Sequence, residues 1–158
     1  MKKVFYLTCF IFFLACEKVE LIPMTSEQII SQVTKYAGEK AVLLNFWSLY
    51  CVPCVDKFPM LMELDEKFED IVVILVNTDF EDEYHKVEKY LKVNHVVSPS
   101  YIKDEKDEPF INGIDPKWTG ALPFTIVFSK ETGNVVDLWE GSMPDLRFEN
   151  AVNSALNS

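Results

Sequence analysis

Two cysteines separated by two residues, Cys51 and Cys54, are the side chains of this 158-residue chain best suited to chemistry. They follow an apolar run, residues 41–47, and open a segment whose apolar residues recur at helical spacing. The start of a helix presents unpaired backbone N–H groups and the positive end of its dipole, which favour a nearby anion. We therefore expect Cys51 to have a pKa below that of a free thiol and to attack disulfides as the thiolate.

Cys54 lies about one helical turn beyond Cys51, and we expect it to resolve the mixed disulfide that Cys51 forms. The alternatives are a structural disulfide and half of a zinc site. A zinc site needs two further ligands, but the two histidines, His85 and His95, lie ten residues apart and away from the cysteines. The sequence therefore favours redox chemistry of the disulfide itself, with no metal and no other cofactor.

The first residues are typical of an export signal. Residues 1–15 combine a basic start with an apolar stretch that is too short to span a membrane. Residues 13–16, Phe-Leu-Ala-Cys, resemble the lipobox of bacterial lipoproteins, in which cleavage precedes the cysteine that carries the lipid. We expect Cys16 to be lipidated, and the alternative is ordinary secretion with cleavage nearby. Since Cys9 leaves with the signal, the Cys-x-x-Cys pair remains for redox work.

Composition predicts one acidic domain behind this signal. The chain is 49% hydrophobic and 13% aromatic, so we expect a tether over residues 16–24 and one domain over residues 25–158. Loss of Lys2 and Lys3 with the signal lowers the formal net charge from −10 to −12. This charge argues against binding to nucleic acid or to anionic lipid headgroups. The densest acidic run, residues 104–108, is interpreted as a surface loop.

Hydrophobic periodicity predicts alternating helices and strands. The apolar runs at 41–47 and 71–77 are typical of central strands buried on both faces, and with the helix between them they predict a right-handed parallel unit. Pro59 is expected to kink the helix after the cysteines, and Leu146 to point inward from the last helix. The predicted helices cover 26–37, 51–70, 82–93 and 143–156, and the predicted strands cover 41–47, 71–77, 96–103, 124–128 and 135–139, the last two as an antiparallel hairpin.

Residues 47–54, Pro59 in the helix after them, and residues 122–123 before a late strand resemble the thioredoxin superfamily. The run Leu-Asn-Phe-Trp at 44–47, together with the export signal, is similar to the TlpA/ResA-type thiol-disulfide oxidoreductases of bacterial envelopes. The likeness covers roughly residues 25–157. It implies an α/β, thioredoxin-like fold with a central mixed sheet and helices on both faces.

The resemblance implies roles for the residues around the cysteines. Pro123 matches the cis-proline that lies against the dithiol, and Leu122 would offer its backbone N–H and C=O to an extended substrate. Trp47 and Tyr50 flank the motif, and either ring can shield the disulfide from water. Pro53 belongs to the uncharged dipeptide between the cysteines, which resembles the reducing members of the superfamily more than the strong oxidants.

Two residues depart from the acid–base pattern of the family. Asn45 stands where thioredoxin has a buried acid behind Cys54, and asparagine cannot ionise. Lys57 stands three residues after Cys54, where some TlpA/ResA relatives carry a glutamate. Lys57 is either a solvated lysine or a cation that faces Cys54 and favours its thiolate. The motif is thus left without an obvious proton acceptor.

The resemblance implies a periplasm-facing reductase of exported protein disulfides in the bacterial cell envelope, held to a membrane by a lipid on Cys16. Its implied partners are protein thiols and disulfides, among them cytochrome c maturation proteins, and a membrane thiol donor. Two other functions stay open. A peroxiredoxin-like peroxidase would use Ser48 in place of threonine, but Leu44 occupies the proline position and Arg147 is the sole arginine. The second is a non-catalytic binding module that has kept the fold.

Overall fold

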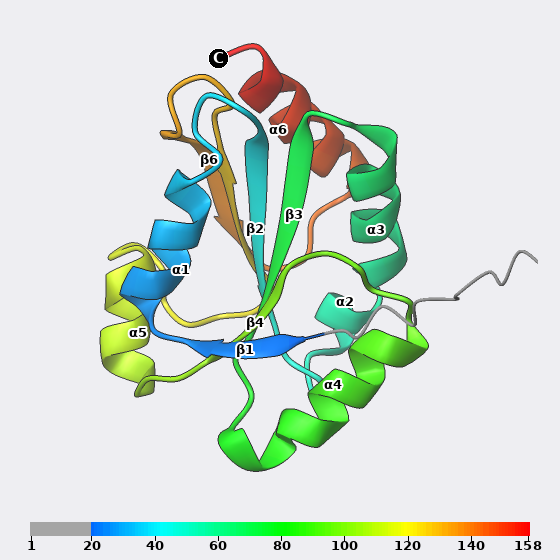
Figure 1. The fold of residues 1–158 in the computed structure, drawn as a ribbon, viewed down its shortest axis with the longest axis vertical. Coiled ribbons are helices and arrows are strands. Elements are labelled where there is room, and N and C mark those ends of the chain that lie inside the picture. The colour runs from blue at the N-terminus through cyan, green and yellow to red at the C-terminus, as the bar shows by residue number, and fades with distance from the viewer. Residues whose placement is uncertain (1–19) are drawn as a thin grey trace, which may run out of the picture.

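The computed structural model describes residues 20–158, whose strands form one central sheet (Figure 1). The strands are β1 (Leu21–Met24), β2 (Ala41–Trp47), β3 (Ile71–Asn77), β4 (Ser100–Lys103), β5 (Phe124–Phe128) and β6 (Val135–Glu140). They lie in the order β1-β4-β3-β2-β5-β6. The first four strands in this order are parallel, whereas β5 is antiparallel to β2 and β6 to β5. The predicted mixed sheet and its final hairpin are confirmed.

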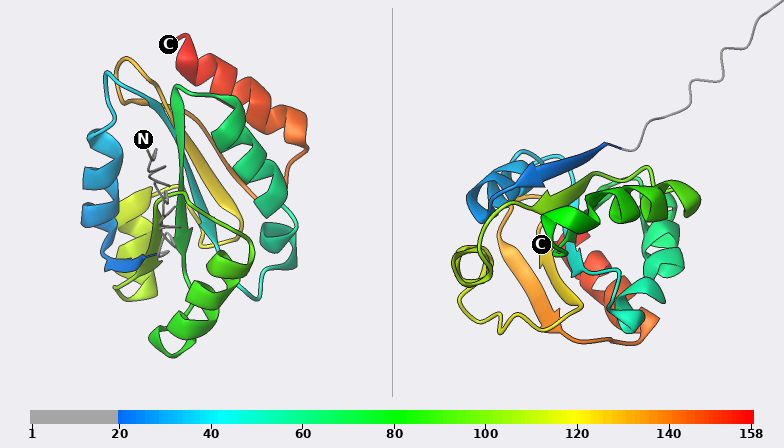
Figure 2. Two further views of the ribbon diagram at one scale, coloured as in Figure 1. Left: turned by 45° about the vertical axis from the view of Figure 1, so that its right-hand side comes forward. Right: turned by 90° about the horizontal axis from the view of Figure 1, so that it is seen from below.

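Helices cover both faces of this sheet (Figure 2). They are α1 (Ser26–Thr34), α2 (Val52–Val55), α3 (Phe58–Lys67), α4 (Tyr84–Val93), α5 (Asp107–Ile114) and α6 (Asp145–Leu156), with a 3-10 turn, η1 (Glu81–Glu83), before α4. α1 and α5 pack on one face, and α3, α4 and α6 pack on the other. Within residues 20–158, no helix is both long enough and apolar enough to cross a membrane.

β2 and β3 are buried along their whole length because successive side chains enter two different cores. Leu43 and Trp47 belong to the core under α3 and α6, whereas Leu44 and Phe46 belong to the core under α1 and α5. The continuous apolar runs in the sequence therefore reflect a sheet that is covered on both sides. The end of β2 is in this way held rigidly where the cysteines begin.

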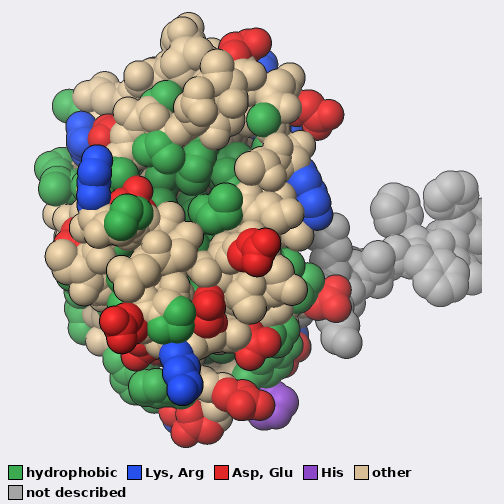
Figure 3. All heavy atoms as spheres, turned by 90° about the vertical axis from the view of Figure 1, so that its left-hand side faces the viewer, with side chains coloured by type: hydrophobic (Ala, Val, Ile, Leu, Met, Phe, Trp, Pro, Cys, Tyr) green, Lys and Arg blue, Asp and Glu red, His purple; other side chains and the backbone are tan. Residues whose placement is uncertain are grey.

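Acidic side chains are prominent on the face that carries α1 and α5 (Figure 3). They gather over the lower half of this face, and apolar side chains line a hollow in its upper half. Part of the acidic excess of the chain is thus exposed to solvent on this face. A polyanionic partner would be repelled there.

The tether expected over residues 16–24 is wrong from Leu21 onward, because Leu21–Met24 form β1. Leu21 is only 2% exposed, and its carbonyl accepts a hydrogen bond of 2.6 Å from the Tyr84 hydroxyl. β1 pairs with β4 at the edge of the sheet, where a proline such as Pro23 is tolerated. Four residues that include a proline give no periodic signal, and the partner strand is remote in sequence.

The acidic loop expected over residues 104–108 is also wrong in part, because α5 begins at Asp107. Phe110 and Ile114 bury the inner side of α5. Gly113 lies so close to α1 that an added Cβ would come within 2.3 Å of the Ser26 hydroxyl oxygen. A glycine inside a short helix weakens its sequence signal, yet this glycine permits the close approach of α5 to α1.

The single kinked helix expected after the cysteines is two helices, α2 and α3. Pro59 does not kink a continuous helix; it lies in the first turn of α3, where its missing N–H would have no intrahelical partner. The predicted inward position of Leu146 is wrong as well, since α6 begins at Asp145 and leaves Leu146 65% exposed. Because the helix after the cysteines is divided in two, α2 has only four residues and its dipole is small.

Candidate active site

Cys51 and Cys54 form a disulfide at the carboxyl end of β2, with their Cα atoms 5.2 Å apart. Cys51 is the N-cap of α2 and is half-buried, whereas Cys54 is 2% exposed. Pro53, in the first turn of α2, is exposed beside them. A partner molecule therefore reaches the sulfur of Cys51 more easily than that of Cys54, which is the asymmetry that an attacking and a resolving thiol require.

The segment Leu122–Pro123 lies at the same end of the sheet as the disulfide. Phe124 pairs with Phe46 across β5 and β2, so Pro123 falls beside Trp47, from which the chain continues to the cysteines. The Leu122–Pro123 peptide bond is cis, as the family resemblance predicted. Leu122 is half-buried and packs against the same hydrophobic cluster as Cys51. The structure thus brings Pro123 and Leu122 together with the cysteines.

The loop before Leu122 is fixed by Trp118. Its indole is 5% exposed and stacks on Phe124, with ring centroids 4.8 Å apart. The indole N–H donates a 3.0 Å hydrogen bond to the carbonyl of Ala121. Gly120 adopts a φ of +91°, and a Cβ there would approach Ile111 to 2.9 Å. The packing of Trp118 against the core therefore fixes the loop that precedes Leu122.

The two rings that flank the motif have different positions. Trp47 is 1% exposed and packs edge to face on Phe58, with centroids 4.5 Å apart, so it belongs to the core beneath the site. Tyr50 is 69% exposed. Tyr50 contacts Glu83, whose pKa is lowered from its usual value, first by the hydrogen bond from Lys86 and then by one from Tyr50. Tyr50 therefore leans toward α4 rather than into the core.

Asn45 and Lys57 both have partners away from the sulfur atoms. Asn45 is 3% exposed, and its side-chain amide donates a 3.0 Å hydrogen bond to the Thr125 hydroxyl. The Lys57 backbone N–H bonds the Cys54 carbonyl, but its ammonium pairs with Asp145 of α6. The continuous helix that would have directed Lys57 toward Cys54 is interrupted after Val55. Lys57 thus holds α3 to α6 instead of standing free in solvent.

A further residue, Asp79, braces the loop before Cys51, and the sequence analysis missed it. Asp79 is 7% exposed, and it accepts a hydrogen bond from the Ser48 hydroxyl and one of 2.8 Å from the Leu49 N–H. A signal was present, because Asp79 follows the buried run of β3 and the carboxyl ends of neighbouring parallel strands meet at one edge of a sheet.

Within residues 20–158, no group of three or more His, Cys, Asp or Glu side chains is arranged to hold a metal ion.

Tyr90 provides a test of the packing beneath the site. Its ring lies 5.4 Å from Trp47 and 5.2 Å from Phe58, and its pKa is raised, first by burial and then by Asp56. A raised pKa in the folded state contributes stability below the unfolded value of about 10, and this contribution is lost as the pH rises further. We expect Tyr90→Phe to lose less stability than the wild type between pH 8 and pH 10.5 in urea unfolding. Equal losses in the two proteins would contradict this assignment.

Comparison with known proteins agrees with this geometry. A family model described as thioredoxin-like matches residues 38–135. This chain belongs to the thioredoxin-like family. Among its relatives are the thioredoxin-like protein YneN of Bacillus subtilis, 29% identical over 115 residues, which are 72% of this chain and 64% of YneN. Another is the thiol-disulfide oxidoreductase ResA of Geobacillus thermodenitrificans, 29% identical over 112 residues, 71% of this chain and 60% of ResA.

Solved structures of the thioredoxin-like family share the fold of this chain. The thiol:disulfide interchange protein of Chlorobium tepidum superposes with a TM-score of 0.63 at 19% identity, over 80% of this chain and 83% of that one. The matches to the first four curated relatives span 50% to 64% of those relatives' own lengths. The match to ResA and the TlpA/ResA-like features of the sequence agree.

Proposed function

We propose that this protein is a thiol-disulfide oxidoreductase that reduces disulfides of exported proteins. One observation carries the proposal: a half-exposed Cys51 is joined to a buried Cys54 at the end of a rigid central strand. The cis Leu122–Pro123 segment beside them offers backbone groups that an extended substrate segment can pair with. The redox group is the disulfide itself, and no other cofactor is proposed.

The proposed reaction begins with the reduced protein. The Cys51 thiolate attacks one sulfur of the partner disulfide, forms a mixed disulfide and expels the other partner sulfur as a thiolate. Cys54, once deprotonated, attacks the Cys51 sulfur and releases the second partner thiol. Two electrons pass to the partner, which ends with two thiols, and the protein ends with the Cys51–Cys54 disulfide. A thiol donor must then reduce that disulfide for another turnover.

The surroundings of the dithiol support the reducing direction. The intervening residues Val52 and Pro53 carry no charge that would stabilise a thiolate. α2, with four residues, contributes a small dipole. A less stable thiolate in the reduced protein makes a weaker oxidant, so a potential below that of the strong oxidases is expected.

The proposed location is the periplasmic side of the bacterial cell envelope. It is supported by the export signal over residues 1–15 and by the lipobox that ends at Cys16. Cys16 lies outside the residues that the structure describes. We propose protein disulfides, including those of cytochrome c maturation proteins, as substrates and a membrane thiol as the electron donor. The acidic domain is not proposed to bind nucleic acid.

Trapping of partners tests this function. We expect Cys54→Ala to accumulate mixed disulfides between Cys51 and its natural partners, because the resolving thiol is gone. The adducts should appear as bands in non-reducing gels that a reductant removes, and mass spectrometry should identify exported cysteine proteins in them. The matched control, Cys51→Ala with Cys54 intact, should trap at most about a tenth as much, since Cys54 is buried. Equal trapping by both variants would overturn the assignment.

The peroxidase alternative loses support in the structure. The Ser48 hydroxyl, which would serve the peroxide site, instead donates to Asp79. The Arg147 guanidinium, which would serve the same site, instead pairs with Asp137 at 2.7 Å and lies over the Trp139 ring.

A further inference from the structure

Asp79 is a buried carboxylate whose hydrogen-bond donors are all neutral. In addition to Ser48 and Leu49, the Asn77 side-chain amide donates to it at 2.9 Å, and the Asp79 backbone N–H donates a 3.0 Å bond to the side-chain oxygen Oδ1 of Asn77. Neutral donors solvate a carboxylate without cancelling its charge. The negative charge of Asp79 is therefore available to act on its neighbours through a medium of lower dielectric than water.

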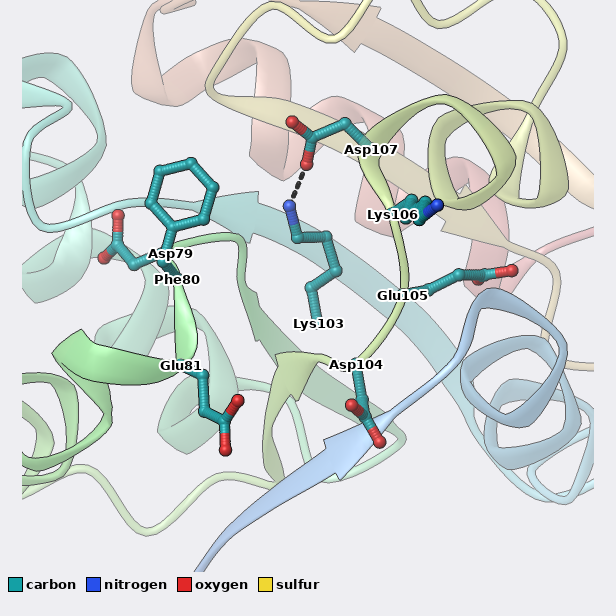
Figure 4. A pocket seen from close by; sticks show the side chains of 8 residues that line it. All are labelled: Asp79, Phe80, Glu81, Lys103, Asp104, Glu105, Lys106 and Asp107. Atoms are coloured by element: carbon teal, nitrogen blue, oxygen red, sulfur yellow. Dashed lines mark hydrogen bonds and ion pairs between the residues drawn. The ribbon is translucent and has the colours of Figure 1, made fainter.

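A lysine lines the same cavity as Asp79 but does not neutralise it. The cavity, about 540 Å³, opens between the carboxyl ends of β3 and β4, and Lys103 extends through it (Figure 4). The Lys103 ammonium pairs with Asp107 on the far side. The Asp79 carboxylate is turned away from Lys103, toward the loop that precedes the cysteines.

The Asp79 carboxylate accepts hydrogen bonds from two successive residues of that loop, Ser48 and Leu49. The Ser48 hydroxyl oxygen accepts a 3.0 Å hydrogen bond from the Tyr50 N–H, and the same hydroxyl donates a hydrogen bond to the Asp79 carboxylate. The Ser48 carbonyl accepts the Cys51 N–H at 3.2 Å. The carboxylate thus orders the turn from Ser48 to Cys51, and the two residues that it bonds, Ser48 and Leu49, precede the attacking cysteine by three and two positions.

We propose that Asp79 is a positioning residue of the dithiol. Its carboxylate fixes the turn that presents Cys51, and its uncompensated charge disfavours the Cys51 thiolate and so keeps the pair a reductant. This inference rests on the exchange chemistry proposed for Cys51 and explains the direction of that chemistry. The short α2 cannot offset the effect with a strong dipole.

Three lysines around the motif are engaged by carboxylates. Lys57 pairs with Asp145, Lys86 pairs with Glu83, and Lys103 pairs with Asp107. The titratable groups on the surrounding elements include Asp56 and Lys57 between α2 and α3, Glu81, Asp82 and Glu83 in η1, Tyr84, His85, Lys86, Glu88, Lys89, Tyr90 and Lys92 in α4, Lys103 in β4, Lys106 and Asp107 at the start of α5, and Asp145 of α6. Asp79 is distinguished from these by its burial and by its bonds to the turn itself.

Asp79→Asn tests the proposal because it keeps the shape of the side chain and removes its charge. In the reduced protein, the pH midpoint of Cys51 alkylation by iodoacetamide should fall by about half to one unit, and alkylation at pH 7 should quicken about threefold. The matched control is Ser48→Ala, which removes a hydrogen bond to the turn but keeps the charge, so its midpoint should not fall. An unchanged midpoint in Asp79→Asn, or an equal fall in Ser48→Ala, would overturn the proposal.

A second measurement uses the unaltered protein and does not depend on the folding of a variant. In the reduced protein, the carbon-13 resonance of the Asp79 carboxyl should show an inflection at the pH midpoint of Cys51 alkylation. The oxidised protein should lack that inflection, and its absence from the reduced protein would refute the charge coupling. Both readouts require no turnover. A protein that reduced no partner disulfide would refute the proposed function and would still yield these midpoints.

Discussion

Cys51→Ser is expected to lower the rate of disulfide reduction by at least about a thousandfold, because serine cannot supply the thiolate that attacks the partner. The rate is measured with a peptide disulfide as substrate, a thiol donor in excess and a chromatographic readout of the reduced peptide. Cys51 is the half-exposed sulfur and Cys54 the buried one, so the remaining thiol should not take over the reaction.

The informative comparison for this prediction is Cys54→Ser. That variant keeps the attacking thiol, so the reduced protein, assayed without the thiol donor, should consume about one equivalent of peptide disulfide in a burst and then stop at the mixed disulfide. Cys51→Ser should show neither burst nor turnover. If Cys51→Ser gave the burst and Cys54→Ser did not, the two cysteines would have the opposite roles.

Phe46→Ala is expected to be the most destabilising single truncation near the site, at about 3 to 5 kcal/mol in the free energy of unfolding. The Phe46 ring is fully buried, and its centroid lies 4.8 Å from Trp118, 5.8 Å from Phe124 and 6.1 Å from Phe110. Its loss would leave a cavity at the junction of β2, β5 and α5. Urea unfolding of the oxidised protein measures the effect.

Phe80→Ala is the matched control for this truncation, because Phe80 is 71% exposed. Its only ring contact to a charge in the described residues is Lys103 at 5.5 Å, so its loss should cost under about 1 kcal/mol. Phe46→Ala should in addition raise the KM for peptide disulfides, since Trp118 then supports the Ala121 carbonyl less firmly. A cost for Phe46→Ala that is no larger than that of Phe80→Ala would show that this core is not the support of the site.

The strands at the centre of the sheet were predictable because each carries its own signal. The apolar runs at 41–47, 71–77 and 124–128 have the bounds of β2, β3 and β5, since burial on both faces demands apolar residues without alternation. β1 and α5 were not predictable from local pattern. Each is short, and each is stabilised by an element remote in sequence, β4 for β1 and α1 for α5.

The candidate site likewise contains residues that the local sequence predicts and residues whose contacts depend on remote parts of the chain. The cysteines and Pro123 were found because a local motif and a family resemblance mark them, and the cis peptide before Pro123 was confirmed. The partners of Lys57 and Leu49 could not be predicted from the sequence, because Asp145 lies 88 residues from Lys57 and Asp79 lies 30 residues from Leu49. Long-range pairs of this kind depend on where the chain folds back, which side-chain spacing along one element does not encode.

The edge strand β1 shortens the segment between Cys16 and the folded domain. If Cys16 carries the proposed lipid, β1 begins five residues after it, a separation of at most about 17 Å, against about 30 Å for the tether expected from the sequence. Leu21 stands level with Asn45 in the pairing register, and β4 and β3 separate β1 from β2, a lateral distance of about 14 Å. The proposed anchor would thus keep the dithiol within about 30 to 40 Å of the bilayer surface, and the proposed reductase would then act first on cysteines exposed close to the bilayer.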